Sequence, residues 1–277
     1  MIQITAADVN KLRQMTGAGM MDCKSALQES NGDFEKAVEY LRKKGQKVAN
    51  KRADRDANQG IVIARVNPNA TFGAMIMLNC ETDFVGLNQE FIDLANAIVD
   101  LAIENKTETL EHLNSFKING ISIADKITEM TGKTGEKMTL AHLETIAAPA
   151  VVAYNHHGNR LASLVGFNKA AQGIITSGKE IAMQVAAMNP IAIDKDDVKK
   201  ETIEKEIEIG KEIAMKEGKP AELAEKIAMG KLSKFYKDST LMNQEFIRDT
   251  NISVGDYLAR IDKELKVSAI RRLMLGA

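Results

Sequence analysis

The chain has 277 residues, of which 44% are hydrophobic and 27% charged, a balance that is ordinary for a soluble protein with two or three compact units. Its net charge of −1 argues against a protein that coats nucleic acid along its length. The sequence shows no signal-peptide pattern and no apolar run of membrane-spanning length, so we expect a cytoplasmic protein without a membrane partner.

The first fifty residues predict three short helices that pack as a small bundle. Thr5 is a candidate cap for the first helix and Asp22 for the second, since both side chains can accept a backbone N–H. A turn signal at 31–33 separates the second helix from a third with apolar residues at the helical period. The loop before the second helix presents two adjacent methionines, Met20 and Met21.

A basic segment follows from Arg42 to Asn58, with seven Lys or Arg residues. It could be a solvated extension of the third helix or an arm that binds nucleic acid. The first alternative is favoured, because Asp54 and Asp56 interrupt the charge and no aromatic residues are interleaved for base stacking. We therefore expect no specific nucleic-acid site.

From Gly60 the apolar pattern changes to a period of two, which indicates strands. Residues 61–66 and 72–78 predict a hairpin, and a helix with one apolar stripe follows through Phe91 and Ile98. Residues 105–148 are polar and predict only one or two helices.

The same order of elements then recurs. Strands at 151–154 and 161–167 flank a turn at 156–159, and a helix then ends before Pro190. Because hairpin-then-helix occurs twice, the sequence predicts an α+β fold with two related subdomains.

The residues from 195 to 236 predict two antiparallel helices that turn at Gly218-Lys219-Pro220 and meet along a narrow apolar seam. After them, Ser253 and Asp256 resemble a capping box, and 266–270 predict a last strand. The predicted seam comprises Val198, Ile203, Ile207, Ile213, Ala214, Leu223, Ile227, Leu232 and Phe235.

Motifs of catalysis and metal binding are missing from the sequence. There is no phosphate-binding loop, no nucleophile elbow and no zinc-binding helix motif. Cys23 and Cys80 are expected to be buried and unpaired, and His156-His157 at a hairpin tip is more typical of an exposed turn than of a metal site. We therefore expect no enzyme activity, no metal and no cofactor.

The segment Thr82-Asp83-Phe84-Val85, between the second strand and its helix, leaves two interpretations open. Phe84 could fold back over the core as a lid, which the residues alone favour. Alternatively, Asp83 and Phe84 could be offered to a partner, since exposed apolar groups on rigid loops often anchor interfaces.

Four motifs, in this order and over nearly the whole chain, resemble the elongation factor Ts family. Each motif alone would be weak, but their order makes the resemblance specific. The motifs are Thr16 to Leu27 with the turn Asn31-Gly32-Asp33, then Thr82 to Val85 with Asn88 and Phe91, then Ile181 to Ala187, and finally Gly218-Lys219-Pro220 with Lys234-Phe235-Tyr236.

The resemblance implies a ubiquitin-associated-like helical domain, two core subdomains and an antiparallel coiled-coil hairpin. It gives these boundaries: 1–50 helical domain, 51–58 basic linker, 59–148 first core subdomain, 149–191 second core subdomain, 192–237 helical hairpin, and 238–277 return to the core with the C-terminal strand.

The resemblance also implies a function, guanine nucleotide exchange on the GTPase domain of elongation factor Tu. In the family, the residues corresponding to Asp83 and Phe84 enter that domain, and the phenylalanine wedges between helices beside the nucleotide and disturbs the Mg²⁺ position. Thr82 and Val85 complete this motif, and the resemblance implies partner contacts for them as well. Further partner contacts are implied for Leu12, Met20, Met21 and His157, whereas Gln184 stands where some members have histidine.

A rival hypothesis is a ubiquitin-associated-type adaptor or a ribosome-associated binding protein without exchange activity. It would explain the first 45 residues but would leave Asp83 and Phe84 without a role. The sequence also leaves open whether the helical hairpin closes on itself, makes a homodimer or a 2:2 complex, or contacts a second partner domain.

Overall fold

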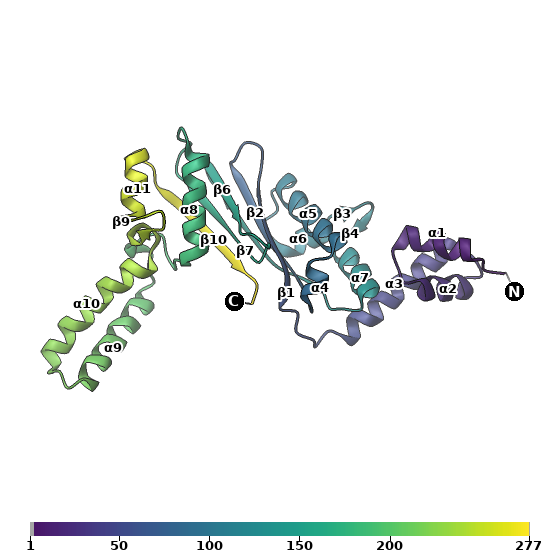
Figure 1. The fold of residues 1–277 in the computed structure, drawn as a ribbon, viewed down its shortest axis with the longest axis horizontal. Helices are drawn as coiled ribbons and strands as arrows, with labels where there is room; N and C mark the ends of the chain where they lie inside the picture. Colours follow the sequence, from purple (N-terminus) through teal and green to yellow (C-terminus); the bar gives the residue numbers. More distant parts are fainter. Residues whose placement is uncertain (1–2, 277) are drawn as a thin grey trace.

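The computed structural model describes residues 3–276 and shows an elongated α+β protein. Three N-terminal helices form one end, two antiparallel sheets lie in the middle, and a pair of long helices projects at the other end (Figure 1). The expected α+β class is therefore confirmed.

The N-terminal helices α1 (Ala6–Thr16), α2 (Met20–Glu29) and α3 (Phe34–Lys51) enclose a small core of their own. Thr5 caps α1 in a capping box with Asp8, as predicted. Asp22 does not cap α2, because that helix already begins at Met20. The Asp22 carboxylate accepts a hydrogen bond from Lys44 on α3 instead, so it ties two helices together.

Helix α3 continues through most of the basic segment, but its inner side is not solvated. It crosses α7 (Ile123–Thr134), where Gly45 meets Gly132 so closely that a Cβ on Gly132 would lie 2.6 Å from the Cα of Gly45. Arg42 also pairs with Glu129 of α7. The backbone contact and the ion pair fix the N-terminal helices to the first sheet's subdomain.

The first sheet has the order β1-β2-β5 and is antiparallel throughout. Its predicted hairpin is confirmed as β1 (Gln59–Val66) and β2 (Phe72–Cys80), with α5 (Gln89–Glu104) packed on one face. The third strand, β5 (Thr139–Ala147), was not predicted. It carries polar residues such as His142 and Glu144 and is only partly buried, so the alternation that marks a strand is weak.

The stretch before β5 holds more structure than expected. It contains α6 (Leu110–Ser115), the two-residue strands β3 (Lys117–Ile118) and β4 (Ile121–Ser122), and α7. These short elements cover one end of the core beneath α5.

The second sheet has the order β10-β7-β6 and is also antiparallel. It comprises β6 (Ala150–Asn155), β7 (Leu161–Phe167) and β10 (Val267–Met274), so the predicted hairpin is confirmed and the last strand extends beyond the predicted Ile270. Helix α8 (Ile174–Met188) packs on its outer face together with α11 (Val254–Ile261), which has the predicted capping box at Ser253. The short strands β8 (Glu245–Phe246) and β9 (Asp249–Ser253) precede α11.

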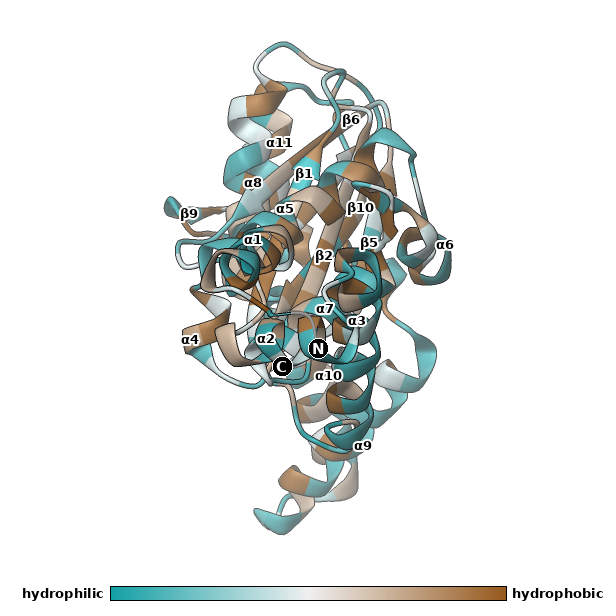
Figure 2. Cartoon of the chain, turned by 90° about the vertical axis from the view of Figure 1, so that its right-hand side faces the viewer, coloured by the Kyte–Doolittle hydropathy of each residue, from teal (hydrophilic) through white to brown (hydrophobic). Residues whose placement is uncertain are grey.

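The two sheets pack against each other through their remaining faces. Val62 and Met75 of the first sheet share a buried cluster with Val151 and Leu164 of the second. Each sheet therefore lies between its own helices and the other sheet, with most hydrophobic ribbon inside (Figure 2). This arrangement makes the edges of both sheets a rigid base for the loops that leave them.

The projecting pair consists of α9 (Lys200–Lys216) and α10 (Ala221–Ser239), flanked by short 3₁₀ turns at Lys195–Asp197 and Leu241–Asn243. The helical hairpin was predicted, and its seam is confirmed in part, because Ala214 and Leu232 of the predicted set are buried. Gly210 and Ala228, which were not predicted, bring the two backbones close, whereas the predicted seam residues Ile213 and Leu223 are exposed. Glycine and alanine carry little hydrophobic signal, so these close contacts are difficult to predict from the sequence.

No helix in the described part of the chain is both long and apolar enough to cross a membrane. Within residues 3–276, no cluster of three or more His, Cys, Asp or Glu side chains has the arrangement of a metal site. Cys23 and Cys80 are both buried and unpaired, as expected.

Candidate functional site

The segment between β2 and α5 forms a single helical turn, α4 (Asp83–Gly86). Thr82 has extended backbone angles and its hydroxyl accepts the N–H of Val85, so it caps this turn. Asn88 then caps α5 by accepting the N–H of Glu90. Two caps within seven residues fix both ends of the loop.

Phe84 is 83% exposed and Leu87 is 74% exposed, and both belong to this segment. The expectation that Phe84 folds back over the core as a lid is therefore wrong. Val85 takes the inward position and packs against the core of the first sheet, which leaves the neighbouring phenylalanine on the outer side of the turn. Figure 2 shows α4 at the edge of the molecule.

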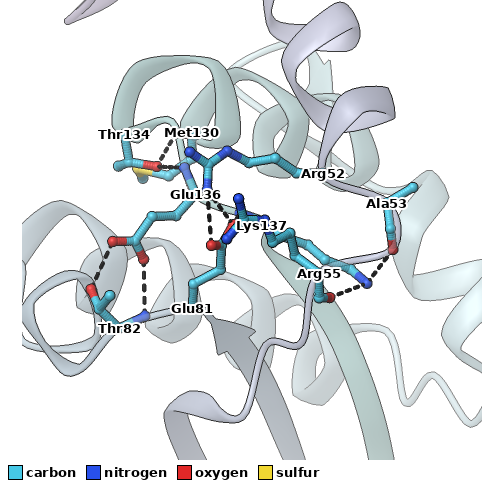
Figure 3. Close-up of polar contacts among 9 residues, drawn as sticks. All are labelled: Arg52, Ala53, Arg55, Glu81, Thr82, Met130, Thr134, Glu136 and Lys137. Carbon is cyan, nitrogen blue, oxygen red and sulfur yellow. Dashed lines mark hydrogen bonds and ion pairs between the residues drawn. The ribbon is translucent and has the colours of Figure 1, made fainter.

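The cap residue Thr82 is itself held by Glu136, which follows the end of α7. The Thr82 hydroxyl donates to Oε1 of Glu136 over 2.7 Å, and the Thr82 backbone N–H donates to Oε2 over 3.0 Å (Figure 3). A carboxylate that accepts two hydrogen bonds from one residue fixes both its side chain and its backbone.

Glu81, directly before Thr82, is the second anchor. Both of its carboxylate oxygens accept from Nη1 of Arg52 over 2.8 Å, and Oε1 also accepts the Lys137 N–H over 2.6 Å (Figure 3). The hydrogen bond from the Lys137 backbone, followed by the interactions with Arg52, lowers the pKa of the Glu81 carboxyl. The Lys137 ammonium donates to the carbonyls of Ala53 and Arg55, so the linker after α3 is tied to the same point.

On the inner side of α4, the backbone at Gly86 packs so closely against the backbone at Gly60 that there is little room for a side chain. A Cβ on Gly86 would lie 3.3 Å from the carbonyl oxygen of Gly60, and Gly60 has a φ of +137° that side chains rarely adopt. The Cys80 thiol donates to the Thr82 carbonyl over 3.0 Å. Burial, reinforced by the Glu136 charge, raises the pKa of this thiol to about 12, so it stays neutral and serves as packing.

His157 lies on the exposed turn between β6 and β7, and this turn comes close to α4. Asp83 and Leu87 line one side of a shallow hollow whose other side is formed by Gly158 and Arg160. The structure therefore brings the turn of His157 and the loop of Phe84 to the same edge of the molecule. The neighbouring His156 accepts or donates a hydrogen bond with the Tyr154 hydroxyl over 2.8 Å, which steadies the turn.

The N-terminal candidates separate into two kinds. Met20 and Met21 are 56% and 71% exposed at the start of α2, so both are available to a partner. Leu12 is fully buried in the N-terminal core, so its side chain is not exposed to a partner in the free chain, and its predicted contact stays a prediction. Its physical role is to support the surface that carries the two methionines.

Gln184 is not available to a partner either. It is fully buried on α8, where its amide donates to Gln244 and to the Glu245 carbonyl and its oxygen accepts the N–H of Ile247. These hydrogen bonds join α8 to the β8 region, so the Gln184 side chain has a structural role in the free chain.

Sequence reasoning missed the anchors of the loop, Arg52, Glu136 and Lys137. Glu136 is 54 residues from Thr82, and Lys137 is 56 residues from Glu81. No local pattern marks residues that meet only through the fold. The one available signal was the density of charge in the linker, which by itself favours a solvated helix.

Comparison with known proteins identifies relatives over the full chain. A family model described as "Elongation factor TS" matches residues 81–277. The chain is 50% identical to proteins named "Elongation factor Ts" from Amoebophilus asiaticus, over 99% of both chains, and from Christiangramia forsetii, over 100% of both chains. A protein of the same name from Chlorobium phaeobacteroides is 41% identical over 100% of both chains.

Proposed function

The chain belongs to the elongation factor Ts family and is therefore a translation elongation factor, and on this premise we propose that it promotes GDP release from elongation factor Tu. The proposal assigns the wedge to Phe84, with Asp83 beside it, and accessory contacts to Met20, Met21 and His157. One observation carries it: an aromatic side chain that is 83% exposed stands on a turn whose two ends are capped and anchored.

An exposed phenylalanine on a rigid turn is suited to forcing a partner apart. Exposed apolar surface is unfavourable in water, so its burial in a partner is a source of binding free energy. The rigid base matters as much, because a flexible loop would lose entropy on binding and would yield to the partner. The anchors of Thr82 and Glu81 supply this base.

The proposed mechanism is a shift between states of the partner. A GTPase holds its nucleotide through phosphate contacts and Mg²⁺, so release is slow unless these contacts weaken. A factor bound away from the base lowers nucleotide affinity only by favouring a state in which the contacts are poorer. No covalent or acid–base step is needed, so we propose a binding protein and not an enzyme.

Membership of the family also suggests a structural class for the two helical parts of the chain. We assign α1 to α3 to the ubiquitin-associated-like class, supported by three short helices with their own core. We assign α9 and α10 to an antiparallel coiled coil, supported by their small-residue seam at Gly210, Ala214, Ala224 and Ala228.

Stopped-flow release of fluorescent GDP from purified elongation factor Tu tests the proposal. The chain should accelerate release in a saturable way, and Phe84→Ala should remove most of the acceleration. Ile175→Ala is a matched control, since Ile175 is an exposed apolar residue of α8 outside the proposed contact surface. Release that the wild-type chain does not accelerate would refute exchange activity and would favour a binding role alone.

A further inference from the structure

Glu136 lies in the short segment between the end of α7 and the start of β5. It directly follows Gly135, whose positive φ of 75° ends α7, and its own N–H donates to the Thr134 hydroxyl over 3.2 Å. The Thr134 hydroxyl in turn donates to the Met130 carbonyl, within the last turn of α7 (Figure 3). The Glu136 backbone is thus fixed to α7 before its side chain reaches Thr82.

The side chain of Glu136 determines how Thr82 acts as a cap. By accepting the hydroxyl proton, Glu136 holds the Thr82 oxygen where it can also accept the Val85 N–H, which is 3.5 Å away. Without this acceptor, the Thr82 side chain would lose the hydrogen bond that favours this rotamer and would cap the turn less firmly. The bond to the Thr82 N–H also fixes the chain direction one residue before Asp83.

Phe84 itself has little other support. Its side chain is mostly exposed, so its direction depends on the backbone of α4. That backbone is only four residues long and too short to be stable alone. Besides the packing of Val85 against the core, the anchor closest to Phe84 along the chain is the pair of hydrogen bonds between Thr82 and Glu136.

We propose that Glu136, which lies outside the motif that carries the wedge, is a positioning residue for nucleotide exchange. It contacts neither nucleotide nor partner in this assignment, and it acts through Thr82 to hold Phe84 in the orientation that enters the partner. The inference rests on the proposed exchange function, but its structural half, the immobilisation of Phe84, can be measured without any partner.

The first experiment measures the motion of the wedge in the free protein. The chain contains no tryptophan, so Phe84→Trp introduces a single fluorescent reporter at the tip. Time-resolved anisotropy of this tryptophan should show restricted local motion, and adding Glu136→Ala should increase its amplitude. Glu144→Ala is the matched control, because Glu144 is also a glutamate whose carboxylate has a side-chain partner, Arg271, but it lies within β5 and does not contact Thr82. Equal anisotropy decays with and without Glu136→Ala would overturn the proposal.

The second experiment measures GDP release over a range of factor concentrations with the native Phe84. Glu136→Ala should lower the saturating rate by about tenfold, the loss expected for a charge-assisted hydrogen bond, and should change the half-saturating concentration by less than about twofold. An interaction realised only on the way to GDP release changes the maximal rate more than the affinity.

Glu136→Gln separates positioning from general damage to the fold. Its amide can still accept the Thr82 N–H and can donate to the Thr82 hydroxyl oxygen, so it should restore the saturating rate to within about threefold of wild type. Circular dichroism melts of all variants give fold stability. A rate loss for Glu136→Ala that Glu136→Gln does not recover, or that Glu144→Ala reproduces, would overturn the proposal. If Glu136→Ala increases the motion of the tryptophan reporter while the wild-type chain does not accelerate GDP release, the exchange function fails instead.

Discussion

Replacing Phe84 by alanine should lower stability only slightly but slow exchange strongly. A phenylalanine side chain buries about 150–250 Å² when it is fully enclosed. Since Phe84 is 83% exposed, the free protein buries only the remainder, about 25–45 Å², worth about 1 kcal/mol. For a chain of this size the melting temperature should therefore fall by at most about 4 °C.

The exposed remainder of Phe84 is available to a partner. It amounts to about 125–205 Å², or about 3–5 kcal/mol if it is fully buried. If this free energy is gained only in the state that releases GDP, Phe84→Ala slows saturating release by at most about 10²- to 10⁴-fold.

Thermal unfolding by circular dichroism and stopped-flow GDP release, measured on the same preparations, check both halves of this prediction. A fall in melting temperature well beyond about 4 °C would show that Phe84 is a packed residue. Saturating release within about twofold of wild type would show that it is no wedge, whatever its exposure.

Further predictions concern the supports of the site. Leu12→Ala should destabilise the N-terminal helices by about 2–5 kcal/mol because Leu12 is fully buried, whereas Met21→Ala should leave the melt unchanged and weaken the complex in a titration. Gly60→Ala should cost more than about 3 kcal/mol in denaturant unfolding, since the new Cβ would lie 2.1 Å from the Leu78 carbonyl oxygen; wild-type stability would refute this. The lowered pKa of Glu81 means that its stabilisation is present at neutral pH, begins to be lost below the unfolded value of about 4.3 and is gone below the folded value. Glu81→Gln should therefore weaken the pH dependence of the free energy of unfolding at acid pH. The same pH dependence in the variant and the wild type would contradict the role of Glu81 as an anchor.

The local sequence pattern was sufficient to predict the helices and strands whose apolar residues are strongly patterned. The hairpins β1-β2 and β6-β7 combine apolar strands with a clear turn signal and are confirmed, as is the capping box at Ser253. Strand β5 was missed because its partly buried face carries polar residues. The seam of α9 and α10 was predicted only in part: Ala214 and Leu232 are buried in it as expected, whereas Gly210 and Ala228 were missed because such small residues carry little hydrophobic signal.

The candidate site was predictable only in part. The resemblance located Asp83 and Phe84, while the residues alone favoured a buried Phe84; the structure shows that Val85 takes the inward place. Burial of Leu12 and Gln184 could not be inferred from their motif positions, since a motif does not separate residues that touch a partner from residues that support the surface.

Reciprocal coupling between nucleotide and factor tests the central claim most directly. The affinity of the chain for elongation factor Tu should be measured by titration with nucleotide-free protein and again with saturating GDP, alongside the GDP affinity with and without the chain. Exchange by a wedge predicts that GDP weakens the complex by the same factor by which the chain weakens GDP binding. Equal affinity of the chain for the free and the GDP-bound partner would contradict the claim, because such a factor cannot shift the nucleotide equilibrium.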